Sequence, residues 1–263
     1  MTGLARRSLL RTLAAAAILG PTGSACASHS RSGLATARGS TPAASASSTP
    51  SFGIASSASS TGSAAPFQIS SGPVGSPRVA LTFHGQGDAD LATALLREAE
   101  SAGARITVLA VGAWLDDQPR TARRILDGGH ELGNHTMHHL DISALPADRA
   151  LAEITDCADR LTRLTGSPGR WFRPSQAKDC TPMVAAQARL AGYGHCLGYG
   201  LDSLDSTDPG PEAVTRTVLD AVRPGSVVSL HLGHPGTVTA LPAILDGLRA
   251  RSLQPVTMSE LLT

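Results

Sequence analysis

Short runs of apolar, often β-branched residues recur along the chain from residue 78 onward and predict strands. Within each run the hydrophobic positions are nearly continuous, which is typical of strands covered on both faces of a parallel sheet. We expect strands at 78–83, 105–111, 130–134, 171–172, 194–201, 226–230 and 255–257.

Longer amphipathic stretches lie between these runs and predict helices. In the first of them, Leu91, Leu95, Leu96 and Ala99 recur at helical spacing. The alternation of strand and helix favours a parallel sheet with right-handed crossovers, built either as a small closed barrel or as an open doubly wound sheet. We expect helices at 89–102, 119–127, 147–164, 181–191, 211–222 and 239–251.

Polar residues follow the carboxyl ends of most of the predicted strands. In a parallel barrel these ends meet on one rim, where the active sites of such barrels are built. The repeated occurrence of polar residues on one edge favours a barrel over an open sheet. We expect a single α/β domain at 78–263. The residues are His84, His135, His139, Arg173, Asp202, Asp205 and His231.

The segment His135-Thr-Met-His-His139 carries the sharpest local signal. Histidines at i and i+4 lie on one face of a helical turn, close enough to share a metal such as Zn²⁺. A solvated histidine cluster that caps a helix is the alternative. His138 is expected to point elsewhere, because the i+4 pairing competes better than i+3.

The first 26 residues have the pattern of an export signal. Arg6 and Arg7 precede an apolar stretch, 9–19, that is too short to remain as a membrane span. The arginine pair resembles a twin-arginine signal, and a general secretory signal would look similar. The small residues before Cys26 resemble a lipoprotein attachment site, with a discarded signal peptide as the alternative.

Residues 27–77 are almost entirely Ser, Ala, Thr, Gly and Pro and predict a disordered linker. A tether behind an export signal suits a protein of the cell envelope or extracellular space. The formal net charge of +1 argues against a nucleic-acid binder. We expect a monomer with no transmembrane span.

Three cysteines lie in the predicted domain, and an exported protein can oxidise a pair of them. The short loop makes Cys180 and Cys196 the first candidates for a disulfide, so that Cys157 is left over. A zinc–thiolate cluster is not expected, because the domain has no C-x-x-C spacing.

Four segments of the domain together resemble one known family. They are Gly129-His-Glu-Leu-Gly-Asn-His-Thr-Met-His-His139, Phe172-Arg-Pro174, Asp202-Ser-Leu-Asp205 and Leu230-His231. In this order and spacing they resemble the polysaccharide deacetylases, the NodB-homology domains of carbohydrate esterase family four. The resemblance extends over residues 78–262.

The resemblance implies a distorted (β/α)₇ barrel that removes N- or O-linked acetyl groups from a carbohydrate with the help of a metal. It implies that His135 and His139 bind the metal and that His231 is the general acid, oriented by Asp205. It also implies that Arg173 positions the catalytic base. In such chemistry the cation polarises the acetyl carbonyl and acidifies a water, and a histidine returns the proton. A buried strand-end histidine and a structural ion pair are the alternatives for His231 and Arg173.

The first motif of this chain departs from the family pattern, Thr-Phe-Asp-Asp-Gly, which supplies the base and then a metal ligand. Here the strand end reads Thr82-Phe-His-Gly-Gln-Gly-Asp88. His84 stands in place of the base, and Gly85 has no side chain to bind a metal. In addition, Ser206 replaces a Trp and Ser175 replaces a Pro.

Three hypotheses follow from this departure. In the first, His84 completes a three-histidine site, an arrangement known for catalytic zinc. In the second, Asp88 reaches back through the glycine-rich loop as base or ligand. In the third, the barrel is a catalytically impaired, glycan-binding module of the wall, because losing a base costs about 10²–10⁴-fold in rate. Retention of five polar groups that are costly to desolvate favours an enzyme.

Several acetylated substrates fit the sequence: peptidoglycan, chitin-like oligomers, xylan acetyl esters and small acetylated amines. An aromatic content of 3% argues against a long sugar-stacking groove. Trp114 and Trp171 are either core residues or sugar contacts, whereas Tyr199 and Asp202 are expected to bind substrate. The metal is Zn²⁺, Co²⁺ or another ion that imidazole sites accept.

Overall fold

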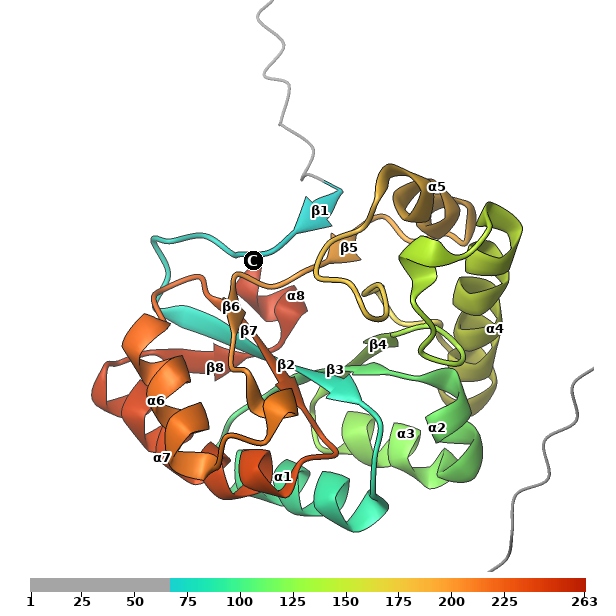
Figure 1. Ribbon diagram of the computed structural model, residues 1–263. Coiled ribbons are helices and arrows are strands. Elements are labelled where there is room, and N and C mark those ends of the chain that lie inside the picture. Colours follow the sequence, from blue (N-terminus) through green and yellow to red (C-terminus); the bar gives the residue numbers. More distant parts are fainter. Residues whose placement is uncertain (1–66) are drawn as a thin grey trace, which may run out of the picture. The chain divides into compact units, whose positions relative to one another are not determined.

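The computed structural model describes residues 67–263, in which strands and helices alternate along the chain (Figure 1). The strands are β1 (Gln68–Ile69), β2 (Arg78–Gly85), β3 (Thr107–Ala110), β4 (Glu131–Asn134), β5 (Cys196–Leu197), β6 (Leu201–Asp202), β7 (Val227–His231) and β8 (Gln254–Val256). The helices are α1 (Ala89–Ser101), α2 (Gly112–Asp117), α3 (Pro119–Asp127), α4 (Ala147–Thr165), α5 (Pro182–Leu190), α6 (Pro211–Ala221), α7 (Pro235–Ala250) and α8 (Met258–Leu261).

The main sheet is parallel, with strand order β4-β3-β2-β7-β6 and with β8 paired to the first half of β2. Phe172 forms parallel bridges to both Asn134 and Cys196, which link the β4 edge to the β1–β5 pair. Helices surround the sheet (Figure 1). The prediction of an α/β fold with a parallel sheet is confirmed.

The central strand β2 shows how the sequence pattern becomes two packing faces. Successive side chains of a strand point to opposite sides. Leu81 and Phe83 belong to the large apolar cluster that also contains residues of α1 and α7, while Ala80 belongs to a smaller cluster on the other side. Thr82 and His84 alternate in phase with Ala80, so β2 delivers one imidazole beyond this smaller core.

Several predicted elements differ from the observed ones. The prediction missed α2, which begins directly after β3, and α7 begins at Pro235, four residues earlier than expected. The predicted strand 194–201 is instead two short strands, because the Gly198 N–H bonds to Ile69 and the Gly200 N–H to Val227. The predicted strand 171–172 is reduced to the bridges of Phe172.

Strand β1 lies within the stretch expected to be linker. It pairs in parallel with β5, and Ser71 forms an antiparallel bridge to Ser226, so the packed structure begins before residue 78. The predicted export signal, Cys26 and most of the linker lie outside the described residues. Within 67–263, none of the helices has the length and apolar character required to cross a membrane.

The predicted disulfide between Cys180 and Cys196 is confirmed, with Cα atoms 6.5 Å apart, and Cys157 is free and buried. Its sulfhydryl lies against the Ala110 carbonyl, and burial raises its pKa to about 12. Cys157 is therefore an inert core residue. The disulfide fastens the segment after Arg173 to β5.

Candidate metal and acid–base site

Parallel register brings together polar residues that are far apart in the sequence. His84 near the end of β2 is directly opposite His231 at the end of β7, and their rings stack with centroids 4.4 Å apart. Asn134 at the end of β4 is opposite Ala110, so the next residue, His135, emerges on the same edge. Neighbouring strands that end in register thus assemble one site.

Three histidines form a compact group of nitrogen atoms. One ring nitrogen from each of His84, His135 and His139 lies within 4.8 Å of the others. His135 is fully buried, His84 is 9% exposed, and His139 is half-buried. A tetrahedral zinc ion with Zn–N distances of about 2.0–2.1 Å needs such closely spaced imidazoles. The three donors therefore fit a divalent cation.

The segment between His135 and His139 is not the helical turn expected from its spacing. Thr136 and His139 have φ angles of 68° and 56°, in the left-handed region. The turn is held by side chains: Asn134 Oδ1 accepts from the Thr136 N–H, and Thr136 Oγ1 accepts from the His139 N–H. The His135 and His139 rings still approach to 4.9 Å. Side-chain hydrogen bonds thus override the helical conformation and leave the pair together.

His138 points away from the cluster, as predicted. Its backbone N–H and its Nδ1 each lie 2.7 Å from a carboxylate oxygen of Glu153. These two contacts with Glu153 anchor the turn to α4.

The hydrogen bonds around His135 fix which nitrogen faces the cluster. His135 Nδ1 lies 3.0 Å from the Arg173 carbonyl oxygen. Because a carbonyl can only accept, Nδ1 carries the proton and Nε2 presents a lone pair. His84 Nδ1, 2.8 Å away, then donates to this lone pair. A backbone acceptor behind a histidine is the usual device that orients a metal ligand.

Both buried imidazoles are neutral at pH 7. Burial lowers the pKa of His84 well below its ordinary value, and the adjacent His135 and Arg173 lower it further. Burial likewise lowers the pKa of His135, with a further contribution from His139. Neutral imidazole is the form that binds a metal.

Arg173 is fully buried beneath the site. Its guanidinium donates to the carbonyls of Leu197 and Gly198 and to Thr82 Oγ1, at 3.0, 3.1 and 2.8 Å, and its Nη1 lies 3.4 Å from His84 Nε2. Burial lowers the pKa of Arg173 to about 9, so the side chain is charged at neutral pH. Among the described residues no carboxylate forms an ion pair with it.

His231 and Asp205 form a closely coupled dyad. His231 Nδ1 lies 2.7 Å from Asp205 Oδ1, while Asp205 Oδ2 accepts from the His231 N–H and from Thr237 Oγ1. Burial alone would raise the pKa of Asp205, but the interactions with His231 and Thr237 outweigh it and lower the pKa. The ionised carboxylate therefore orients the imidazole with its Nε2 away from Asp205.

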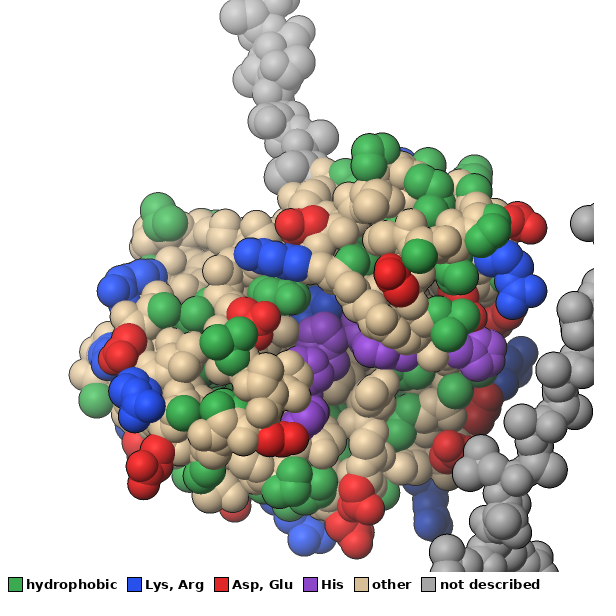
Figure 2. Space-filling model, in the orientation of Figure 1, with side chains coloured by type: hydrophobic (Ala, Val, Ile, Leu, Met, Phe, Trp, Pro, Cys, Tyr) green, Lys and Arg blue, Asp and Glu red, His purple; other side chains and the backbone are tan. Residues whose placement is uncertain are grey.

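Three of these histidines, His84, His139 and His231, line a pocket of about 190 Å³. In the space-filling view, histidine side chains gather in a hollow of the surface (Figure 2). The pocket contains the predicted substrate-binding residues Tyr199 and Asp202. Its full lining is His84, His139, Gln176, Ala177, Lys178, Tyr199, Asp202, Ser206, Ser229 and His231.

Two residues of the altered first motif are accounted for by local geometry. Asp88 caps α1, with Oδ1 accepting from the N–H groups of Asp90 and Leu91, and it is absent from the pocket lining. A Cβ at Gly85 would lie 2.8 Å from Val108 Cγ1 and 3.0 Å from Ala110 Cα. The backbone here is too close to β3 for a side chain, so position 85 cannot supply a ligand in this arrangement.

Both tryptophans belong to the packed interior. Trp114 donates from Nε1 to the Gly87 carbonyl, and Trp171 donates to Glu131. They are 6% and 0% exposed, so neither acts as a sugar platform in this conformation.

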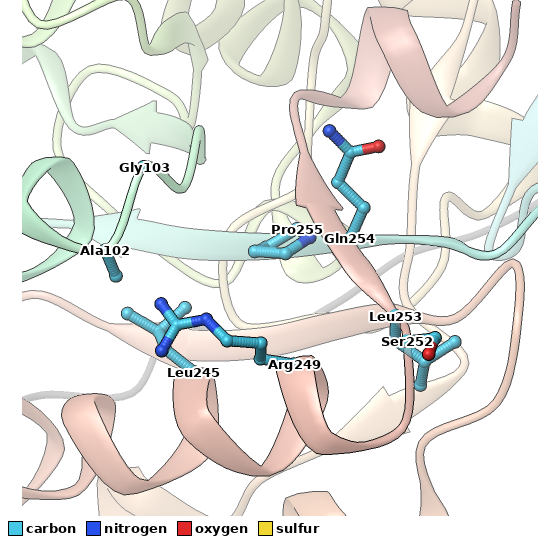
Figure 3. A pocket seen from close by; sticks show the side chains of 8 residues that line it. All are labelled: Ala102, Gly103, Leu245, Arg249, Ser252, Leu253, Gln254 and Pro255. Atoms are coloured by element: carbon cyan, nitrogen blue, oxygen red, sulfur yellow. The ribbon is translucent and has the colours of Figure 1, made fainter.

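A larger pocket of about 260 Å³ lies near the opposite end of β2, between the end of α1, α7 and β8 (Figure 3). Its charged residue is Arg249, which donates to Asp246. It contains no histidine or carboxylate. The acid–base and metal-ligating groups therefore single out the smaller pocket.

The sequence analysis missed Ser229, Thr237 and Lys178. Ser229 Oγ lies 3.0 Å from His84 Nε2 and was detectable from the strand period, because it is two residues before His231. Lys178 was detectable as the single lysine of the chain. Thr237 carried no local signal, since it meets Asp205 only through the fold.

Comparison with known proteins agrees with this geometry. The family model for polysaccharide deacetylase matches residues 71–194. A chitooligosaccharide deacetylase of Bradyrhizobium is 33% identical over 173 residues, covering 56% of this chain and 74% of the relative. A peptidoglycan-N-acetylglucosamine deacetylase of Bacillus cereus is 30% identical over 188 residues, covering 70% and 87%.

Solved structures share the fold. The crystal structure of a peptidoglycan N-acetylglucosamine deacetylase has a TM-score of 0.70 at 25% identity, over 74% of this chain and 92% of that one. A CE4 family pseudoenzyme from Bacillus anthracis has a TM-score of 0.72 at 22% identity, over 76% and 70%. From the ordered motifs, the matching family model and these relatives, the chain belongs to the polysaccharide deacetylase family.

Proposed function

We propose that this protein removes an acetyl group from a carbohydrate at the pocket between the three histidines and the His231–Asp205 dyad. The observation that carries the proposal is the convergence of three imidazole nitrogens within 4.8 Å of one another beside a histidine paired to a buried carboxylate. The proposal treats the curved row of parallel strands as the distorted barrel of the family and the strand ends as its catalytic rim.

His84, His135 and His139 would hold a divalent cation, with Zn²⁺ and Co²⁺ the candidates that imidazole sites accept. A bound cation polarises the acetyl carbonyl and acidifies a water molecule. The fit requires a change at His84, because its Nδ1 donates to His135 Nε2. To offer a lone pair at Nδ1, His84 moves its proton to Nε2, where Ser229 Oγ can accept it. Arg173 Nη1 is itself a donor 3.4 Å from this nitrogen, so it would turn to another acceptor.

His231 would act as the general acid. Asp205 holds Nδ1, so Nε2 is free to give a proton to the leaving amine or alcohol as the bond to the acetyl carbon breaks. The side chain of His231 is 23% exposed, which gives a substrate access to it. Arg173 would hold the position of His84, which occupies the place of the usual base.

A second function, glycan binding without hydrolysis, is favoured by one specific observation. The acidic pair of the first motif is absent, and the packing around Gly85 leaves no room for a replacement carboxylate. A structural neighbour described as a CE4 family pseudoenzyme indicates that this fold also occurs without activity. In this alternative the same pocket binds acetylated sugar, and the chain remains attached to the wall or envelope.

The relatives named above act on chitooligosaccharides and on peptidoglycan N-acetylglucosamine. We therefore propose an exported protein that works on a cell-wall or extracellular glycan. The twin arginines and the small residues before Cys26 support export, with lipid attachment at Cys26 as one route to the envelope.

The deciding experiment measures bound metal and released acetate on the same preparation of the full chain. We expect one equivalent of metal, loss of most of it in His84→Ala, and retention in Asp88→Ala. Acetate release from a panel of acetylated oligosaccharides should follow metal content. An unchanged content of bound metal in His84→Ala would exclude the three-histidine site. Sugar binding with no acetate release in the presence of any of the metals would support the glycan-binding function instead.

A further inference from the structure

One wall of the pocket lies outside the helices and strands. This pocket wall, residues 176–180, follows Arg173 along the chain and contributes Gln176, Ala177 and Lys178 to the lining. At its first residue, Gln176 Nε2 donates to the carbonyl of His139, 2.8 Å away. The pocket wall is therefore joined at one end to the backbone of a histidine of the cluster.

The other end of the pocket wall is held by a residue from the stretch expected to be linker. Gln68 lies on β1, and its Oε1 accepts from the Cys180 N–H at 3.0 Å. Strand β1 is itself fixed to β5, because the N–H groups of Cys196 and Gly198 donate to carbonyls of β1 at 2.7 Å. Gln68 thus connects the main chain of the pocket wall to a paired strand.

The disulfide does not make this hydrogen bond redundant. The bond between Cys180 and Cys196 ties a side chain of the pocket wall to β5, whereas Gln68 holds the main chain. Cys180 is half-buried, so without Gln68 its N–H would lose its acceptor where water has limited access. A polar group left unpaired in this way costs more free energy than the hydrogen bond contributed. We therefore expect the main chain of the pocket wall to move when residue 68 cannot accept.

The nitrogen of the Gln68 amide also lies against the pocket wall. Gln68 Nε2 is buried and has no hydrogen-bond partner among the described residues. A Cβ at Gly198 would lie 2.7 Å from this nitrogen, 2.8 Å from Asp179 Oδ1 and 3.0 Å from the Lys178 carbonyl oxygen. The amide and the pocket wall thus meet over the backbone of a glycine. Two acceptors of the wall lie near a donor that lacks one.

We propose that Gln68 is a positioning residue that holds the pocket wall closed against a bound sugar. Gln68 is absent from the pocket lining, so it acts through the wall and sets affinity without entering the chemical step. This inference rests on the proposed function, because it concerns how that pocket is held. The residue precedes the stretch 71–194 that the family model matches, so the role falls to a part of the chain outside that match.

The test compares Gln68→Met with the unmodified full chain, with triacetylchitotriose as ligand and substrate. Methionine preserves the length and packing of the side chain, but its thioether is only a weak acceptor. The loss of one net hydrogen bond should raise Kd in calorimetric titration, and KM for acetate release, by about twofold to tenfold. The content of bound metal and kcat should stay unchanged. Gln187→Met, which removes a half-buried glutamine of α5 outside the pocket lining, is the control and should alter neither Kd nor KM.

Hydrogen exchange provides a readout that is local to the pocket wall. In Gln68→Met the amides of residues 176–180 should exchange faster than in the unmodified protein, while those of α6 should exchange at the same rate. Saturating triacetylchitotriose should slow exchange of the pocket wall in both proteins. Faster exchange throughout the domain would mean that Gln68 only stabilises the fold, and it would overturn the proposal.

The remaining outcomes separate this inference from the proposed function. Sugar binding with the same Kd and KM in Gln68→Met as in the unmodified protein overturns the role of Gln68 and leaves the proposed function standing. A fall in kcat at unchanged KM also overturns that role, because the amide would then act on the reacting groups. If the unmodified protein neither binds nor deacetylates the sugar with any metal, both proposals fail.

Discussion

The two sides of the pocket achieve their charge state in different ways. On the carboxylate side (Asp205, His231 and Thr237), a buried carboxylate accepts hydrogen bonds from three donors. On the imidazole side (His84, His135, His139 and Arg173), a buried guanidinium and neutral rings lie together without a paired carboxylate in the described chain. One side is compensated by its own residues, and the other is not.

This difference indicates where catalytic competence is decided. The carboxylate side is complete as an acid, because orientation and charge come from within the protein. On the imidazole side, neutral imidazole rings face one another. This side gains a chemical role only when a ligand binds to it. The proposed enzyme and the proposed binding module therefore differ on the imidazole side alone.

The largest expected effect comes from removing the acid on the carboxylate side. His231→Ala should reduce acetate release by about 10²–10⁴-fold, since general acid–base groups typically contribute this much. Bound metal should be retained, because His231 is outside the three-histidine group. Steady-state acetate release and metal analysis on the same samples measure the two effects.

A second histidine–aspartate pair provides a matched control. His234 Nδ1 lies 2.8 Å from Asp208 Oδ1, but His234 is not in the pocket lining. The ring of His234 packs edge-on against that of His231, with centroids 5.5 Å apart, so the control variant is Asp208→Asn, which should keep acetate release close to that of the unmodified protein. A comparable loss in both variants would mean that the dyad acts through local structure and not as the acid.

An intermediate effect is expected from adding a side chain on the imidazole side. In Gly85→Ala the new Cβ meets Val108 and the backbone of Ala110, so overpacking should lower the free energy of unfolding by about 1–3 kcal/mol. Urea denaturation measures the change. Gly194→Ala is the control, because nothing lies within 4 Å of its Cβ position. Equal stability of the two variants would show that β2 and β3 can separate, and that position 85 could accept an acidic ligand.

The smallest expected effect is a difference between the two sides in the pH range over which they change the free energy of unfolding. For His84 and His135 the folded pKa lies below the unfolded value of about 6.5, so the unfolded chain binds more protons as pH falls through that value. The free energy of unfolding should then decrease by up to about 1.4 kcal/mol per pH unit for each group. Asp205 has a lowered folded pKa, so its contribution persists to about pH 4 and is lost only as pH falls further.

Urea denaturation of metal-free protein between pH 7 and pH 3 tests this separation. His84→Gln should flatten the pH dependence between about pH 6.5 and 5, and Asp205→Asn should alter it only near or below about pH 4. An unchanged slope above pH 5 in His84→Gln would mean that the buried ring titrates normally in the folded state.

The sequence by itself determined the elements whose signals are local. The apolar run of β2 and the helix that begins at Pro119 follow from side-chain period and fixed proline φ. The order of the motifs also determined the family. These features need only neighbouring residues, so they are readable along the chain.

The tertiary structure alone decided how the site is completed. His84 meets His231, 147 positions later, through the register of β2 and β7, and the closeness of β3 excludes a side chain at Gly85. The turn between His135 and His139 is set by Asn134, Thr136 and Glu153 and not by its own spacing. Contacts between distant segments depend on strand register and packing distances, which no local pattern encodes.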